Sequence, residues 1–341
     1  MRHLIDVEQT ELIDWLAQQG QPKFRAQQIR RWVFQGRAHS FDDMTDLPAA
    51  LRQQLAEEFQ LWSTSVVRQQ QSEDGTEKLL LEMSDRSRVE CVLIREGSRR
   101  TICVSTQVGC AMGCVFCASG LDGVDRNLSS GEILEQILFV QRQLPSDERI
   151  SHIVVMGMGE PLANLDALLP ALQVATDKEG LGIGARRITI STVGLPPAID
   201  RLIAAGSPFH LAVSLHAHTD QLRNELVPVN RQIGLSNILA AADRYFDASG
   251  RRLTFEYVLL AGINDAEHHA RGLVKLLRGR PALLNVIPFN PVAGLDFRTP
   301  SRESVQQFRL ILEEGGINVQ FRQRKGDEID AACGQLRRAS S

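Results

Sequence analysis

Cys110-Ala111-Met112-Gly113-Cys114-Val115-Phe116-Cys117 places three cysteines in the spacing CxxxCxxC. Thiolates are soft ligands that suit zinc, copper(I) or iron–sulfur clusters. A structural zinc site normally has four ligands, whereas only three cysteines gather in this stretch. A cubane cluster held by three thiolates leaves one iron open, where a substrate can chelate. The spacing therefore predicts a reactive iron–sulfur cluster with Cys110, Cys114 and Cys117 as its ligands.

Two other interpretations of these cysteines stay open at this point. His152, or another distant side chain, could complete a zinc site as the fourth ligand. A disulfide is less favoured, because clustered cysteines in an intracellular chain are more often metal-binding or catalytic than oxidised.

Length and composition bound the class of protein. The chain has 341 residues, of which 43% are hydrophobic, and this suits one large domain with appendages or two domains. The formal charge of −3 gives no global electrostatic reason to bind nucleic acid, so such a partner must be argued from local patches. No stretch has the pattern of a signal peptide or a membrane span, which predicts a cytoplasmic protein without membrane contact.

The first part of the chain, residues 1–76, is expected to be a helical accessory domain. Apolar residues recur at helical spacing through residue 62, and Gly20 and Pro22 interrupt the pattern. Residues 22–37 hold five basic and no acidic residues, interleaved with aromatic ones. Such a stretch is either a solvated helix face or a surface for RNA phosphates and bases.

The spacing of apolar residues changes from helical to strand-like at Glu77. Residues 78–83, 89–95 and 101–105 are short β-rich runs separated by turn residues, which predicts a β-hairpin that leads into the next domain. The third run continues into the cysteine octet. The octet is therefore expected at the C-terminal end of a strand, where ligand sites gather in α/β folds.

Strands and helices then alternate. The expected strands are 153–156, 187–192, 210–215, 253–259, 283–288 and 317–321, and helical patterns separate them at 165–176, 196–205, 235–246, 266–277 and 301–313. Regular alternation implies parallel strands with right-handed crossovers. With six or seven units, residues 77–322 are predicted to form an α/β fold with a partial (β/α)6-type barrel, followed by a tail at 323–341.

Polar residues follow several of the expected strands. Glu160, Ser191, Ser214 and Asn290 each come where a parallel barrel displays its loops, and His216 follows Ser214. Individually each could be a turn or capping residue, but together they suggest one shared ligand. Gly157-Met158-Gly159 is not a dinucleotide loop, because Pro161 and Leu162 follow where the motif would place its third glycine and a helix.

Two further cysteines differ in their surroundings. Cys103 lies inside the strand that enters the octet, where a cysteine is usually a small buried hydrophobe. Cys333 lies in the tail, between glycines and without clear periodicity, so it is either a nucleophile or an unused surface thiol.

The octet, with Phe116 just before its third cysteine, resembles the signature of the radical S-adenosylmethionine (SAM) superfamily. Nearly the whole chain further resembles the RlmN/Cfr family of RNA adenosine methyltransferases, and its RlmN branch in particular. The motifs that carry this likeness are PKFRAQQI, FDDMTDLP, MGMGEPLAN and DAACGQL.

The resemblance implies a set of site residues. A 4Fe-4S cluster would bind to Cys110, Cys114 and Cys117, with SAM on its open iron. The catalytic residues would be Cys333 as methyl carrier, Cys103 as resolving cysteine and Glu90 as proton acceptor. The SAM-contacting positions would be Gly159, Glu160, Ser191, Ser214, Leu215, His216 and Asn290.

The implied reaction uses two SAM molecules per turnover and methylates C2 of an adenosine. C2 is electron-poor and cannot attack a sulfonium methyl, whereas the Cys333 thiolate can. The methylated cysteine would then react as a carbon radical with the ring, and Cys103 would release the product by forming a disulfide with Cys333.

The implied partners are 23S ribosomal RNA at the peptidyl-transferase centre, tRNA beside the anticodon, and an electron donor of the flavodoxin or ferredoxin type, with the enzyme a monomer. Two rival functions are a Cfr-like enzyme that methylates C8 of the same adenosine, and a non-catalytic iron–sulfur RNA-binding protein. The binding protein would have no need for Cys103, Cys333 and the SAM residues together.

Overall fold

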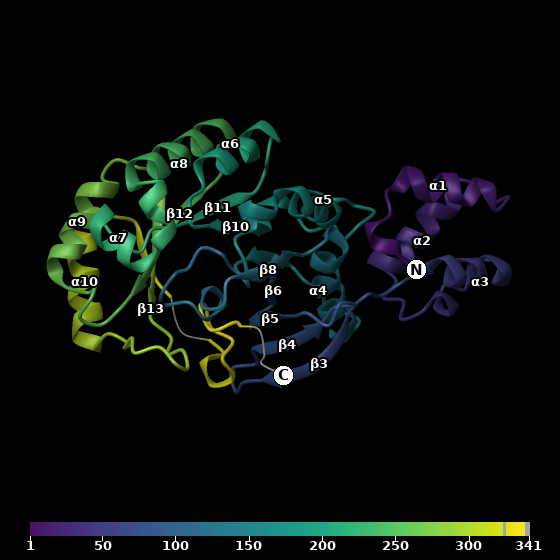
Figure 1. The fold of residues 1–341 in the computed structure, drawn as a ribbon, viewed down its shortest axis with the longest axis horizontal. Coiled ribbons are helices and arrows are strands. Elements are labelled where there is room, and N and C mark those ends of the chain that lie inside the picture. Colours follow the sequence, from purple (N-terminus) through teal and green to yellow (C-terminus); the bar gives the residue numbers. More distant parts are fainter. Residues whose placement is uncertain (323–324, 338–341) are drawn as a thin grey trace.

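A computed structural model describes residues 1–322 and 325–337, and a ten-stranded sheet forms its centre (Figure 1). From one edge to the other the order is β14-β13-β12-β11-β10-β9-β6-β5-β4-β3. The strands from β6 to β14 pair in parallel, and those from β3 to β6 pair antiparallel. The bounds are β3 Ser65–Gln71, β4 Glu77–Glu82, β5 Arg88–Glu96, β6 Arg99–Cys103, β9 His152–Val155, β10 Ile188–Thr192, β11 His210–Ser214, β12 Leu253–Leu259, β13 Ala282–Pro288 and β14 Val319–Phe321.

Helices connect the parallel strands and cover the outer face of the curved sheet (Figure 1). They are α4 Ser130–Gln143, α5 Leu165–Thr176, α6 Pro196–Ala204, α7 Asp220–Leu226, α8 Leu235–Ser249, α9 Glu267–Leu277 and α10 Arg302–Glu314. Apolar strand residues such as Ile190, Leu211, Val213 and Phe255 are fully buried. Burial of a parallel sheet on both faces accounts for the apolar character of these strands.

The predicted α/β partial barrel is confirmed, with seven parallel strands in the described ranges. The antiparallel extension is larger than the expected hairpin, because β3 adds a strand within residues 1–76. This strand lies at the edge of the sheet and is mostly exposed, with Val67 46% accessible. Its polar sequence, Ser-Val-Val-Arg-Gln-Gln-Gln, gives no burial pattern that would predict it.

The N-terminal part is helical, as predicted, and projects to one side of the barrel (Figure 1). It contains α1 Gln9–Gln18, α2 Phe24–Phe34 and α3 Ala49–Glu58, with two-residue strands β1 Arg2–His3 and β2 Phe59–Gln60. Leu16, Ile29, Leu51, Leu55 and Phe59 are each at most 1% exposed and form its core. The helices therefore stack on a shared apolar face, as their spacing requires.

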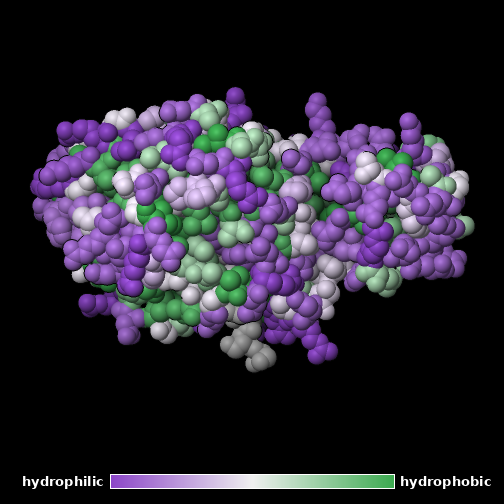
Figure 2. Space-filling view, turned by 45° about the horizontal axis from the view of Figure 1, so that its top comes forward, coloured by the Kyte–Doolittle hydropathy of each residue, from purple (hydrophilic) through white to green (hydrophobic). Residues whose placement is uncertain are grey.

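The outer surface is mixed in character. In Figure 2 hydrophilic residues dominate both ends of the molecule, and hydrophobic residues show mainly near the middle of this face. Within the described ranges, the helices are all too short or too polar to cross a membrane.

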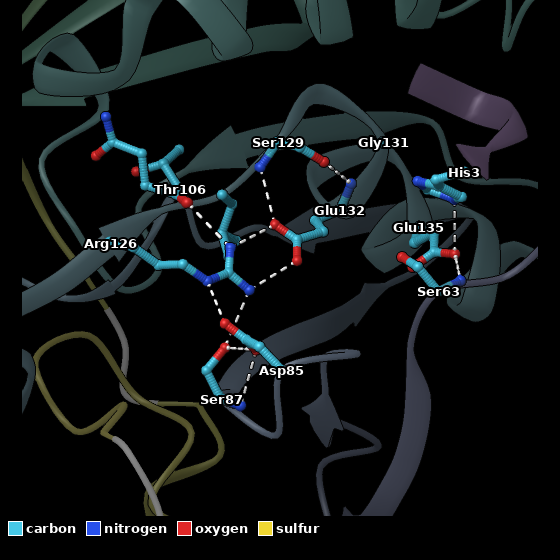
Figure 3. Close-up of polar contacts among 12 residues, drawn as sticks. His3, Ser63, Asp85, Ser87, Thr106, Arg126, Ser129, Gly131, Glu132 and Glu135 are labelled. Carbon is cyan, nitrogen blue, oxygen red and sulfur yellow. Dashed lines mark hydrogen bonds and ion pairs between the residues drawn. The ribbon is translucent and has the colours of Figure 1, made fainter. Parts of the chain in front are cut away.

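A partly buried polar cluster joins the N-terminal part to the barrel (Figure 3). His3 Nδ1 lies 3.0 Å from Asp6 Oδ2, and His3 Nε2 lies 3.0 Å from Glu135 Oε1 on α4. Asp6 also accepts a hydrogen bond from the Gly131 backbone at 2.6 Å, at the first turn of α4. Glu135 accepts two hydrogen bonds from Ser63. The accessory domain thus helps to cap a barrel helix.

This cluster predicts a pH-dependent stability. Burial alone would lower the pKa of His3, but its contacts with Asp6 and Glu135 raise it to about 9 from an ordinary value of 6.5. The stabilisation is therefore complete below pH 6.5 and is lost as the pH rises through about 9. It amounts to at most roughly 3 kcal/mol.

Urea denaturation of the wild type and of His3→Gln at pH 6 and pH 9.5 measures this effect. The variant is expected to be the less stable at pH 6 and nearly equal at pH 9.5. An equal difference at both pH values would show that folding does not raise the pKa of His3.

Candidate active site

The cysteine octet forms a loop between two short strands. β7 Gln107–Gly109 pairs antiparallel with β8 Val124–Asn127, and the backbone N–H of Cys110 donates to Gly123 O at 2.8 Å. Farther along, the N–H of Val115 donates to Leu226 O at 3.1 Å, so the loop is tied to the α7 region of the barrel. The loop lies at the C-terminal ends of the parallel strands, as predicted.

All three cysteines of the octet line one cavity of about 940 Å³, its open mouth included. Burial raises the pKa of each thiol, and that of Cys110 reaches about 12. Of the expected SAM contacts, six line the same cavity: Gly159, Glu160, Ser191, Ser214, His216 and Asn290. Leu215 is fully buried and does not line it. The structure therefore brings together nearly all of the residues that the sequence singled out.

The donor set fits a cluster better than a single zinc ion. The thiols line the cavity wall, which suits the larger cubane. His152, the suggested fourth zinc ligand, begins β9, whereas the cavity lies beyond the other end of that strand at Met156 and Gly157.

Glu160 is the most firmly held polar group of this cavity. Its Oε1 accepts from the Leu162 N–H at 3.0 Å and its Oε2 from the Val193 N–H at 2.8 Å. Its own N–H donates to Gln107 Oε1 at 2.8 Å. Burial raises its pKa, and these donors oppose the rise. A carboxylate held in this way is oriented before any ligand arrives.

The glycines beside Glu160 are required by close packing. A Cβ on Gly157 would lie 2.7 Å from Val104 O, and one on Gly159 would lie 2.7 Å from Gln107 Cβ. Gly159 also has φ 101°, which side chains rarely tolerate. The loop can therefore pass directly over the strand that leads to the octet.

Arg223 on α7 is a site residue that the sequence did not reveal. It is fully buried and donates to three backbone oxygens, those of Leu215 at 3.0 Å, Val193 at 2.6 Å and Ser214 at 2.8 Å. It thereby fixes the loops after β10 and β11, including His216, whose ring packs edge-on against Phe116 at 4.8 Å. A lone arginine in a helix carries no motif that would mark this role.

The tail returns to the site and places Cys333 beside it. The Ala118 N–H donates to Gly334 O at 2.8 Å, and Asn290 Nδ2 donates to Cys333 O at 3.2 Å. Arg322 Nη1 lies 3.3 Å from Cys333 Sγ as a hydrogen-bond donor. Cys333 therefore lines the same cavity as the three octet cysteines.

A second, larger cavity continues from the first through the barrel interior. It measures about 1920 Å³ with its open mouth, and Cys103 lines it. Residues that line both cavities are Met156, Glu256, Ile287, Asn290, Arg322 and Cys333. Burial raises the pKa of Cys103 to about 12, and the nearby Cys333 adds to the rise. Cys103 and Cys333 thus both line the second cavity, and Cys333 lies where the two cavities meet.

Glu90 on β5 lies behind the tail and lines neither of these cavities. Its Oε1 is 3.0 Å from Lys78 Nζ, and its Oε2 accepts from the Arg337 N–H at 3.0 Å. Burial raises its pKa, and the charge of Lys78 opposes the rise. Any contact of Glu90 with a ligand therefore requires the tail to shift.

Most of the basic stretch at residues 22–37 contacts the protein itself. Arg37 donates to Leu144 O and Glu148 O, each at 2.6 Å, and Arg30 lies 3.8 Å from Asp177. These arginines hold α2 against the barrel. Phe24 is 51% exposed, and the guanidinium of Arg25 lies 4.9 Å from its ring centre.

Two basic residues of the tail also face the protein itself. Arg322 faces the two cavities, and Lys325 lies 3.8 Å from Glu96. The basic residues of the tail also make it a candidate for contact with RNA phosphates, but two of them, Arg324 and Arg338, lie outside the described residues. The exposed end of α2, around Phe24, thus remains the part of the basic stretch most open to an RNA strand.

Comparison with known proteins agrees with this geometry. Residues 2–61 match the model of the ribosomal RNA large subunit methyltransferase N-terminal domain, and residues 104–273 match that of the radical SAM superfamily. A crystal structure of a radical SAM methyltransferase from Sphaerobacter thermophilus is 44% identical, with a TM-score of 0.95 and 99% of each chain covered.

Curated relatives extend over the same length. The chain is 67% identical to a probable dual-specificity RNA methyltransferase RlmN of Rhodopirellula baltica, over 98% of this chain and 91% of the relative. It is 50% identical to the protein of the same description in Symbiobacterium thermophilum, over 96% and 89%.

Proposed function

Since this chain belongs to the RlmN family of radical SAM RNA methyltransferases, we propose that it methylates C2 of an adenosine in 23S ribosomal RNA. The adenosine beside the anticodon of certain tRNAs is the second substrate. The observation that carries this proposal is the position of Cys333, which shares one cavity with the three cluster cysteines and another with Cys103.

The residues around these cavities supply the steps of the reaction. Cys333 takes a methyl group from a first SAM by displacement, as its nucleophilic sulfur faces the SAM cavity. When bound, the cluster and a second SAM supply the 5′-deoxyadenosyl radical that removes hydrogen from this methyl group. The carbon on Cys333 then bonds to the adenine ring, which must be unstacked to enter the cavity.

Glu160, Ser191, Ser214, His216 and Asn290 would orient SAM in the first cavity. The Oδ1 atom of Asn290 is buried, and no described residue donates to it, so it is free to accept a hydrogen bond from a ligand. We place this group of side chains around the amino and carboxylate ends of SAM, because those ends chelate the open iron near the three thiols.

Mass spectrometry of RNA from a strain that lacks this gene tests the proposal. Loss of 2-methyladenosine from both ribosomal and transfer RNA is expected. Loss of 8-methyladenosine instead would establish the alternative, a Cfr-like C8 methyltransferase, and loss of neither would refute both. We further propose a monomeric cytoplasmic enzyme that receives electrons from a flavodoxin or ferredoxin.

Glu90→Gln is expected to slow the breakdown of the covalent RNA adduct by about 100-fold, because the amide cannot take the proton from the ring carbon. The amide oxygen would still accept the Arg337 N–H, so the tail should keep its position. Rapid-quench sampling of the adduct on denaturing gels gives the rate. Glu82→Gln, which changes the partly exposed partner of Arg88 on the neighbouring strand, is the matched control. Normal adduct breakdown in Glu90→Gln would assign the base elsewhere.

A further inference from the structure

Four polar side chains form a row across the inner face of the barrel. In the sheet register Ser214 is opposite Glu256, Glu256 is opposite Asn285, and Asn285 is opposite Gln320. Cross-strand neighbours point to the same side of a sheet, and each of these four lines one or both of the cavities. The row therefore runs through the space that Cys333 faces.

Glu256 is the unusual member of this row. It is 6% exposed, and in the described part of the chain its carboxyl group receives one hydrogen bond, from Asn285 Nδ2 to Oε2 at 2.7 Å. Buried carboxylates normally have several donors or a close cation. Burial raises the pKa of Glu256, and the positive charge of Arg322 opposes the rise. Among the described residues, however, the two side chains form no ion pair within 4.0 Å. Glu256 thus retains acceptor capacity toward the cavity.

The position of Glu256 limits what it can bind. It lines both cavities together with Cys333, so it borders the space between the SAM side and the Cys103 side. A base whose ring carbon reaches the methyl group on Cys333 must occupy that space. Glu256 is therefore placed to contact the edge of the base rather than the phosphate backbone, which a carboxylate would repel.

Adenine and guanine differ in the group that such a carboxyl oxygen would meet. Adenine carries a 6-amino group, which donates hydrogen bonds, whereas guanine has a carbonyl oxygen at that position. A carboxyl oxygen accepts from the amine and opposes the carbonyl. Asn285 fixes the Glu256 side chain through Oε2 and leaves Oε1 to the base.

Building on the proposed function, we propose that Glu256, positioned by Asn285, accepts a hydrogen bond from the 6-amino group of the target adenine and selects adenine over guanine. This role is separate from the SAM contacts and from the handling of the methyl group. It assigns base recognition to the inner face of β12 and β13.

Two short RNA hairpins that differ only at the target nucleoside test this inference. One carries adenosine and the other carries purine riboside, which lacks the 6-amino group. With the reconstituted holoenzyme and SAM, the wild type is expected to favour adenosine by about 10- to 100-fold in kcat/KM. Glu256→Ala is expected to bring this ratio close to one, and Glu256→Gln, which keeps an acceptor oxygen, should restore part of it.

The controls separate recognition from folding and from the main reaction. Glu267→Ala changes an exposed carboxylate on α9 and should keep the wild-type ratio. If Glu256→Ala does not fold or turn over, the ratio of Kd values for the two hairpins, measured on Glu256→Gln, takes its place and should fall below that of the wild type. S-methylation of Cys333, which needs no RNA, reports the proposed function independently.

Suppose that S-methylation of Cys333 persists. Equal use of both hairpins by the wild type, or an unchanged ratio in the Glu256 variants, would then overturn the inference and leave the proposed function standing. Absence of both S-methylation and RNA methylation would instead overturn the proposed function, and the inference with it.

Discussion

Cys333→Ala is expected to reduce RNA methylation to background, because the adenine carbon cannot take a methyl group from SAM directly and no other thiol of the described chain occupies the same position. The three octet cysteines are the proposed iron ligands, and Cys103 lines only the second cavity. The variant should also lose the mass increase of about 14 Da in the tail peptide, one added methylene, that reports S-methylation.

The controls for this prediction use the remaining cysteine. Cys91 on β5 is fully buried and lines neither of the two cavities, so Cys91→Ala should keep both S-methylation and turnover. Iron content and SAM binding of Cys333→Ala should match the wild type, because the octet is unchanged. Product formation above background by Cys333→Ala would mean that the methyl group is carried elsewhere.

Cys103→Ala is expected to accumulate a covalent RNA–protein adduct, up to one per enzyme molecule. Release of the product requires the sulfur–carbon bond at Cys333 to break as a sulfur–sulfur bond to Cys103 forms, while the carbon keeps the bonding electron pair and takes the proton that the Cys103 thiol loses. An alanine cannot supply that sulfur. Burial raises the pKa of Cys103 to about 12, so it stays a protonated thiol until the reaction reaches this step. The nearby charge of Arg322 favours its ionisation at that point.

Denaturing gels with labelled RNA measure this adduct, and nuclease digestion followed by peptide mass spectrometry locates it on Cys333. The double variant Cys103→Ala/Cys333→Ala should form no adduct at all. Free release of methylated RNA by Cys103→Ala would show that Cys103 is not the resolving thiol.

The sequence predicted the barrel well because burial on both faces leaves a clear apolar pattern in each strand. It singled out the three octet cysteines because their spacing is local, and the structure gathers all three on one cavity. The exposed strand β3 was missed because an edge strand in contact with solvent need not be apolar. Part of the basic stretch was misleading, since Arg30 and Arg37 bind the barrel rather than face solvent.

Residues that act through the tertiary fold could not be predicted from the sequence. Arg223 binds three backbone oxygens that follow or end two different strands. The register of β11, β12 and β13 places Glu256 beside Ser214 and Asn285, and only this register turns it toward the cavities. The sequence marked Cys333 as unusual. That its segment lies against the octet depends on contacts such as Ala118 N–H to Gly334 O, which no local pattern encodes.

The docked tail also imposes an order on biosynthesis. Its segment is the last part of the described chain to be made, and it bonds to the octet loop through Ala118 and through Ser119, whose hydroxyl donates to Leu336 O. The segment follows β14 Val319–Phe321 closely in the chain, so the last barrel strand and the tail leave the ribosome almost together. The octet loop must therefore be in place before the tail can bond to it, and we expect docking of the tail to be one of the last steps of folding.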